Sequence, residues 1–169
     1  MNEMDLKQQI HKAVTAALAT PDFSTEDGMH VPPVMTLALA KKLIARVEQK
    51  AAEMGVKAVI AVSNAGGHPV AVVCMDDAYI ASYDVAVSKS FTGVAVKMST
   101  AELKQFAQPG GALYGIQYTN DHKIIIFGGG VPLMVNNCVI GGLGVSGGTE
   151  EQDTALAEFG RGIFAEELS

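Results

Sequence analysis

Two glycine clusters late in the chain, residues 128–130 and 141–148, have the composition of a loop that binds a nucleotide phosphate. Their context argues against that chemistry. No G-x-x-x-x-G-K-[ST] sequence is present, and GGLGVSGG lacks the helix that must start inside a dinucleotide-binding loop. Val139, Leu143 and Val145 flank the glycines and indicate a β-strand, where glycine usually marks a bulge or the close approach of another backbone. We therefore predict a structural role for these glycines.

Ser146 stands in the pattern G-x-S-x-G, which carries the nucleophile of α/β-hydrolases. In those enzymes an acidic residue and a histidine follow the serine, whereas no histidine follows Ser146. A tight turn from a strand into a helix explains the pattern better. In an enzyme, the polar candidates would be Lys89, Asp76 and Ser146, with backbone N–H groups of the glycine turns holding an oxyanion.

The histidines and cysteines do not form a metal-binding pattern. Four histidines lie in different segments: His11, His30, His68 and His122. No H-x-x-x-H pair is present, so a metal site would have to be assembled by the tertiary structure. The two cysteines, Cys74 and Cys138, are far apart and we expect them to be buried thiols.

The composition excludes several classes of protein. An apolar fraction of 49% in 169 residues excludes general disorder and is enough for one domain with a hydrophobic core. No apolar run reaches the roughly 18 residues of a membrane span. A net charge of −6, no basic cluster and no tryptophan argue against nucleic acid as a partner. The N-terminus lacks the apolar core of a secretory signal, so we expect a soluble cytoplasmic protein.

The first 19 residues are predicted to form a separate amphipathic helix. Its apolar stripe has helical spacing: Leu6, Ile10, Ala13, Val14, Ala17 and Leu18. Residues 20–35 have the composition of a linker, and the domain proper is expected at 36–169. An isolated helix of this length is marginal in water, so the stripe needs a partner. Either it packs on its own domain or in an oligomer, or it docks in a groove of another protein.

The sequence of the domain predicts helices that alternate with β-hairpins. Thr36 and Gly55 bound one helix, and a hairpin of strands 56–63 and 69–75 follows. Two helices come next, at 79–98 and 99–108. The first has an apolar stripe: Ile80, Tyr83, Val87, Phe91, Val94 and Met98.

Three further strands are then expected at 113–118, 123–127 and 139–145, and the segment 131–135 is expected to extend the sheet. A last helix follows, capped by Thr149 and Gln152. Asn136 and Asn137 suit a hairpin turn because asparagine tolerates positive φ. Consecutive hairpins require an antiparallel sheet covered by helices, which is an α+β fold.

Three segments of the domain resemble the GlcG/HbpS family, which includes the C-terminal domain of PduO: AVSNAGGHPVAVVCMDDA, SKSFTGVAVKMST and FGGGVPLMVNNCVIGGLGVSGGTEEQD. The resemblance extends from Thr36 to Phe159. It implies an antiparallel five-stranded sheet flanked by helices, assembly into dimers or larger symmetric oligomers, and haem or a related tetrapyrrole as ligand.

The chain departs from the family pattern at charged positions. Cys74 replaces the arginine and Asp77 the glycine of the R-M-D-G-A pattern, and Ser63 replaces the aspartate of the V-D-x-x-G turn. A charged pair between that arginine and that aspartate is therefore not expected.

The residues implied for the ligand site follow from the matched positions: His30, Lys89, Gly129, Gly130 and Pro132. Haem-binding members use a histidine near the start of the domain as an axial iron ligand, and the nearest equivalent is His30. The alternative for His30 is an exposed linker residue. His68 is expected to be a turn residue first and a ligand second.

The first of three hypotheses is a non-catalytic oligomeric haem-binding accessory protein of a diol or glycerol pathway. The N-terminal helix resembles the encapsulation peptides that target cargo to bacterial microcompartments, so a shell protein is its expected partner. The alternatives are an enzyme acting on a small aldehyde, diol or hydroxy acid, and an assembly or scaffold protein.

Overall fold

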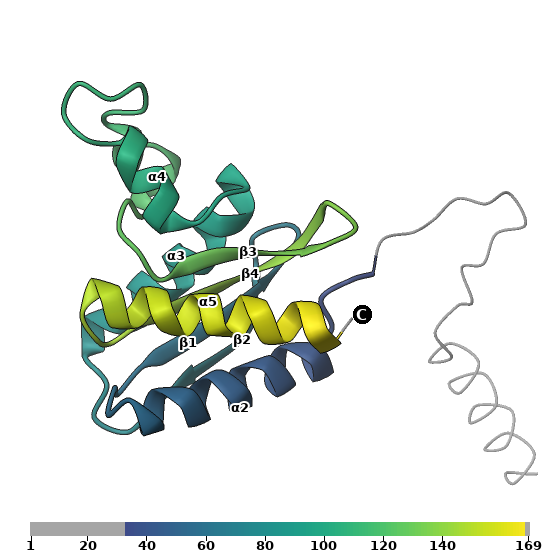
Figure 1. Ribbon diagram of the computed structural model, residues 1–169. Helices are drawn as coiled ribbons and strands as arrows, with labels where there is room; N and C mark the ends of the chain where they lie inside the picture. The colour runs from purple at the N-terminus through teal and green to yellow at the C-terminus, as the bar shows by residue number, and fades with distance from the viewer. Residues whose placement is uncertain (1–32, 168–169) are drawn as a thin grey trace, which may run out of the picture. The chain divides into compact units, whose positions relative to one another are not determined.

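The computed structural model describes residues 33–167, which form one antiparallel sheet covered by helices on both faces (Figure 1). The elements follow in this order: α2 (Leu37–Glu53), β1 (Val59–Asn64), β2 (Pro69–Cys74), α3 (Ile80–Val96), α4 (Thr100–Phe106), the short 3-10 helices η1 (Ile116–Tyr118) and η2 (Asn120–His122), β3 (Gly130–Val135), β4 (Cys138–Ser146) and α5 (Glu150–Glu167). The predicted helix at 1–19, most of the predicted linker and His30 lie outside the described residues.

The strands are arranged in the order β2-β1-β4-β3, and every neighbouring pair is antiparallel. Figure 1 shows α2 and α5 side by side on one face of the sheet, with α3 on the other. The main core lies under α2 and α5, where Val47 and Leu156 meet Leu143 of the central strand β4. The predicted α+β class with an antiparallel sheet is confirmed.

Local signals placed the helix ends correctly. Thr36 caps α2, since its Oγ1 accepts a hydrogen bond from the Leu39 N–H at 3.2 Å, and Gly55 follows that helix at φ 68°. Thr149 and Gln152 form a reciprocal capping box: Gln152 N–H donates to Thr149 Oγ1 at 3.3 Å, and Thr149 N–H donates to Gln152 Oε1 at 3.0 Å.

The Asn136–Asn137 turn between β3 and β4 is also confirmed. Both residues have positive φ, 48° and 63°, which gives a two-residue hairpin between Val135 and its partner Cys138. Asparagine adopts this conformation at lower cost than other residues with a side chain.

The prediction of five strands was wrong, because the described residues form four. Residues 113–118 and 123–127 were expected to be strands, but the first segment turns into η1 after Gly115 at φ 91°. Three successive residues in η2, at 120–122, have φ between 51° and 60°, which no strand allows. In the second segment the Ile125 N–H donates to Thr92 Oγ1 on α3 at 3.0 Å instead of to a neighbouring strand.

The two cysteines are exposed, so the expectation of buried thiols was wrong. Cys74 is the last residue of the edge strand β2, and Cys138 is the first residue of β4 after the hairpin turn. Strand ends and sheet edges leave such side chains uncovered.

The most deeply buried side of helix α3 is not the apolar stripe that its sequence displays, although Val87 and Val94 of that stripe contact the sheet side. Its buried residues are small or polar: Ser82, Ala86, Lys89, Ser90, Thr92 and Gly93. A Cβ on Gly142 would collide with the Ser90 carbonyl, and one on Gly144 with the Ala86 carbonyl. The glycines of β4 therefore let the α3 backbone lie directly on the sheet, which confirms the predicted close approach and leaves Ile80 97% exposed.

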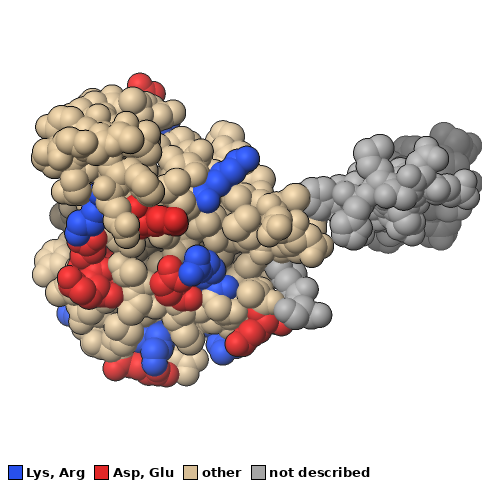
Figure 2. Space-filling view, turned by 45° about the horizontal axis from the view of Figure 1, so that its top comes forward, with Lys and Arg blue, Asp and Glu red and all other residues tan. Residues whose placement is uncertain are grey.

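Charges on the domain surface lie in mixed clusters. Figure 2 shows blue and red side chains next to one another on the face that it presents. Exposed ion pairs of the domain include Lys104–Glu150 at 2.7 Å and Lys50–Glu53 at 3.1 Å. Among the described residues, no helix combines the length and the apolar character that crossing a membrane requires.

Candidate functional site

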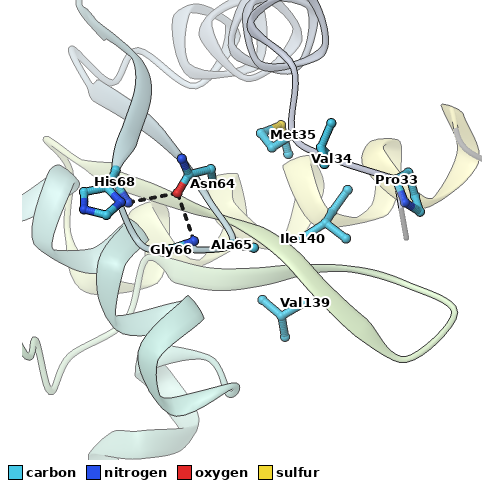
Figure 3. Close-up of a pocket in the computed structure, with 9 residues that line it drawn as sticks. All are labelled: Pro33, Val34, Met35, Asn64, Ala65, Gly66, His68, Val139 and Ile140. Carbon is cyan, nitrogen blue, oxygen red and sulfur yellow. Dashed lines mark hydrogen bonds between the residues drawn. The ribbon is translucent and has the colours of Figure 1, made fainter. Parts of the chain in front are cut away.

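An apolar pocket of about 410 Å³ lies where the described chain begins (Figure 3). Three separate segments line it: Pro33, Val34 and Met35 before α2, Asn64, Ala65, Gly66 and His68 of the β1–β2 turn, and Val139 and Ile140 at the start of β4. Its volume lies within the range of small-molecule sites, about 300–1,000 Å³. Besides the polar side chains of Asn64 and His68, the walls offer aliphatic carbon and the sulfur of Met35, which suit a largely apolar ligand.

One carboxamide shapes the turn that forms one wall of this pocket. Asn64 Oδ1 accepts hydrogen bonds from the Gly66 N–H at 2.9 Å and the His68 N–H at 3.2 Å. Gly67 has φ 75°, which closes the turn. Figure 3 shows the His68 ring at the side of the turn away from Pro33 and Ile140. His68 is exposed and belongs to the turn, as predicted.

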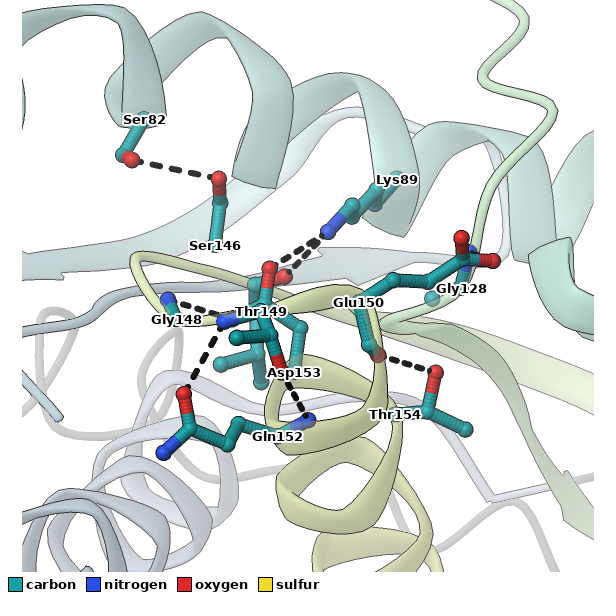
Figure 4. Close-up of polar contacts among 12 residues, drawn as sticks. Ser82, Lys89, Gly128, Ser146, Gly148, Thr149, Glu150, Gln152, Asp153 and Thr154 are labelled. Atoms are coloured by element: carbon teal, nitrogen blue, oxygen red, sulfur yellow. Dashed lines mark hydrogen bonds and ion pairs between the residues drawn. The ribbon is translucent and has the colours of Figure 1, made fainter.

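A second group of polar residues surrounds Lys89 on α3 (Figure 4). Lys89 is fully buried, and its ammonium donates to the Val145 carbonyl at 2.8 Å and to Asp153 Oδ2 at 2.9 Å. The Phe127 ring lies 4.9 Å from Nζ. Burial lowers the pKa of Lys89 below its ordinary value, while Asp153 opposes the shift. The three N–H groups of this ammonium are thus matched by two oxygen acceptors and one aromatic ring.

The glycine clusters converge on the same ion pair. Asp153 Oδ1 accepts from the Gly148 N–H at 2.8 Å, and a Cβ on Gly129 would lie 2.6 Å from Lys89 Nζ. The Gly130 N–H donates to Thr100 Oγ1 at 2.9 Å. Lys89 and Asp153 thus fix both glycine segments against α3 and α5.

A smaller pocket of about 290 Å³ lies beside this ion pair. Its residues come from α3 and its N-cap, from the segment before β3, from the end of β4 with the following turn, and from the start of α5: Tyr79, Ala81, Ser82, Val85, Phe127, Ser146, Gly147, Gly148, Glu150 and Asp153. Ser146 Oγ donates to Ser82 Oγ at 3.2 Å, and both hydroxyls are buried. Glu150 is engaged by Lys104 at 2.7 Å and by the Gly128 N–H at 2.9 Å, and these bonds lower its pKa.

The structure brings together only part of the residue set expected from the sequence. Lys89, Gly129 and Gly130 lie around one ion pair, and Pro132 follows on β3; all four are buried and none lines the apolar pocket. Asp76 is exposed and does not line the pocket that contains Ser146.

Sequence reasoning missed residues that line both pockets. The sequence places Met35 at the end of the linker and Asn64 in the N-A-G-G turn, and neither position by itself indicates a pocket. Ser82 lies on the side of α3 away from the apolar stripe, so periodicity gave no reason to select it. No group of three or more His, Cys, Asp or Glu residues within 33–167 could hold a metal ion.

Two curated proteins of Citrobacter freundii are similar to this chain over most of its length. An uncharacterised 15.0 kDa protein of the dhaT–dhaS intergenic region of Citrobacter freundii is 46% identical over 132 residues, which are 78% of this chain and 93% of that protein. The corrinoid adenosyltransferase PduO of Citrobacter freundii is 38% identical over 128 residues, 75% of this chain. This chain spans only 38% of the length of that PduO.

Solved structures agree with the observed fold. Klebsiella pneumoniae protein ORFY superposes with a TM-score of 0.78 at 41% identity, over 84% of this chain and 98% of that one. A complex of PduOC with haem superposes with a TM-score of 0.74 at 34% identity, over 77% of this chain and 94% of that one. The family model described as haem degrading protein HbpS-like matches residues 35–161. The chain therefore belongs to the HbpS-like family, as its sequence motifs predicted.

Proposed function

We propose that this chain is a non-catalytic haem-binding accessory protein of a diol or glycerol pathway. The apolar pocket of about 410 Å³ at the start of the domain carries the proposal, because its aliphatic walls suit the face of a macrocycle. The similarity to PduOC, crystallised with haem, supports haem as the ligand. The relatives in the dha region and in PduO support the pathway. Bound haem would supply a redox-active iron that a protein side chain could ligate.

We propose His30 as the residue that would ligate the iron, because it stands three residues before Pro33, the first residue of the pocket wall in the chain. Met35, Val139 and Ile140 would pack against the macrocycle. Direct ligand contacts by Lys89, Gly129, Gly130 and Pro132 stay a prediction. In the proposed protein Lys89, Gly129 and Gly130 also hold α3 against the sheet, around the Lys89–Asp153 ion pair.

Titration of the full chain with haemin tests this assignment. The wild type is expected to shift the Soret band at a stoichiometry of one haem per chain, and His30→Ala is expected to lose that shift. His11→Ala is the matched control, because it removes an imidazole from the same part of the sequence. Absence of a Soret shift in the wild type would refute haem binding. A shift retained in His30→Ala would refute the assignment of His30 as the iron ligand. Steady bleaching of bound haem in the presence of a reductant and air would refute the proposal that the protein is non-catalytic.

The proposed protein is a cytoplasmic homo-oligomer. The apolar side of α3 supports self-association, since Ile80 and Tyr83 are 97% and 49% exposed within the described domain. Symmetric homo-oligomers are the commonest assemblies of such domains.

Residues 1–19 are proposed to direct the protein into a microcompartment by docking on a shell protein. A reporter fused to residues 1–20 should enter compartments in cells that make them. A diffuse reporter would instead favour the alternative, in which this segment packs on its own domain or in an oligomer. The same reporter fused to a scrambled copy of this segment is the control.

A further inference from the structure

We propose that the pocket beside the Lys89–Asp153 ion pair binds a small uncharged molecule with two neighbouring hydroxyl or carbonyl oxygens, through Ser82 and Ser146. This site is separate from the proposed haem pocket, with which it shares no lining residue. The two assignments can therefore fail independently.

The buried serine pair is the first observation. Ser82 and Ser146 are 5% and 7% exposed, and their hydroxyls, 3.2 Å apart, bond to each other. Within residues 33–167 neither hydroxyl has another hydrogen-bond partner, although each can donate once and accept twice. Whichever serine donates to the other, one O–H and several lone pairs are left without a partner. Buried hydroxyls in that state are costly unless another molecule satisfies them.

The charge of the surrounding residues selects an uncharged ligand. Asp153 and Glu150 line the pocket, but each carboxylate already has a cation, Lys89 at 2.9 Å and Lys104 at 2.7 Å. The local charge is thus balanced, so an added anion would face two carboxylates whose cations are already engaged. An added ammonium would find no free carboxylate.

The shape of the pocket selects a small ligand. The remaining lining consists of Ala81, Val85, the aromatic side chains Tyr79 and Phe127, and the Gly147–Gly148 segment, which contributes no side chain. Two adjacent oxygens on one ligand can meet the two serine oxygens at once, while the carbon skeleton contacts the apolar wall. A molecule with a single oxygen would satisfy one serine only.

The lysine beside the pocket limits the proposal to binding. Lys89 Nζ is fully buried and its donors are directed at Val145, Asp153 and the Phe127 ring, so it has no lone pair facing a ligand. The pocket also lies on a different side of α3 from the exposed Ile80. At 3.6 residues per turn, Ala81, Ser82 and Val85 point away from the Ile80–Tyr83 side, so self-association through that side leaves the pocket accessible.

Ligand-observed NMR on the full chain tests the site with four probes. Glycerol and 1,2-propanediol are expected to bind, 1-propanol about fivefold more weakly because one hydrogen bond is lost, and lactate more weakly because it is an anion. Ser82→Ala and Ser146→Ala should each weaken binding of 1,2-propanediol about fivefold. Ser88→Ala is the control, because Ser88 lies on the same helix but lines a different pocket.

A second variant separates loss of binding from loss of folding. Ala81→Phe fills the pocket from an exposed position of α3 and keeps both hydroxyls, so it should abolish binding with an unchanged melting temperature. The proposal would be overturned if none of the three pocket variants changed binding, or if lactate bound as well as 1,2-propanediol. It would also be overturned if neither glycerol nor 1,2-propanediol bound. The haemin Soret shift is expected to stay the same in these variants.

Discussion

The ammonium of Lys89 and the carboxylate of Asp153 lie 2.9 Å apart with both side chains buried, and this pair joins α3 to α5 across the end of β4. Each partner has further hydrogen bonds, Lys89 to Val145 and Asp153 to Gly148. A buried pair with its remaining donors and acceptors satisfied stabilises one arrangement of the elements that it connects.

Removal of one member of this pair should be strongly destabilising. Lys89→Met is expected to lower the free energy of unfolding by about 3–5 kcal/mol, because Asp153 would be left as an unpaired buried charge. Urea denaturation measures the change. The double variant Lys89→Met/Asp153→Leu should recover much of the loss. Lys57→Met, in the exposed Lys57–Asp77 pair, is the control and should leave stability unchanged. A Lys89→Met protein as stable as the wild type would contradict a structural role.

Acid should destabilise the domain partly through Glu150. Hydrogen bonds from Lys104 and the Gly128 N–H lower its pKa in the folded state below the ordinary value of 4.5. The unfolded chain takes up the proton first, so this contribution is present above pH 4.5 and is lost as the pH falls through the folded pKa. Chemical denaturation at a series of acidic pH values should show a shallower loss for Glu150→Gln. Lys104→Met, which removes the main cause, should have a similar effect, and unchanged slopes in both would refute the assignment.

Gly144 should tolerate no side chain. A Cβ there would collide with the Ala86 carbonyl of α3, and a backbone atom cannot move aside as a flexible side chain can. Gly144→Ala is expected to lower the free energy of unfolding by about 1–3 kcal/mol or more. Gly162→Ala is the matched control, because that helical glycine has nothing within 4 Å of an added Cβ. This control should raise stability by about 0.5–1 kcal/mol. Equal effects of the two changes in thermal unfolding would argue against close packing of α3 on β4.

A charge on the exposed side of α3 should disrupt the proposed oligomer. Ile80→Asp places a carboxylate at a side chain that is 97% exposed within the domain, so folding should be unaffected while an interface formed by this side would be lost. Light scattering coupled to size exclusion is expected to give a lower mass for Ile80→Asp than for the wild type. Lys41→Asp, on the exposed side of α2, should keep the wild-type mass. An unchanged mass for Ile80→Asp would show that the oligomer interface does not include this side of α3.

Local sequence signals determined the parts of this fold that depend on a few neighbouring residues. Thr36, Thr149 with Gln152, and Asn136–Asn137 each satisfy or bend their own backbone, so their helix ends and hairpin turn were predictable. The helices α2, α3, α4 and α5 and the two antiparallel hairpins, β1–β2 and β3–β4, were predictable from such local signals. The glycines of β4 were also recognised as positions of close approach.

Tertiary structure decided which surfaces face each other. The apolar stripe of α3 predicted burial of Ile80 and Tyr83, but the glycine surface of β4 accepts the small side of that helix instead. Residues 113–127 have strand-like composition, yet positive φ at 115 and at 120–122 turns them away from the sheet. Both pockets combine segments far apart in the chain, such as Met35 with Ile140 and Ser82 with Ser146. Such contacts depend on long-range packing, which local periodicity does not encode.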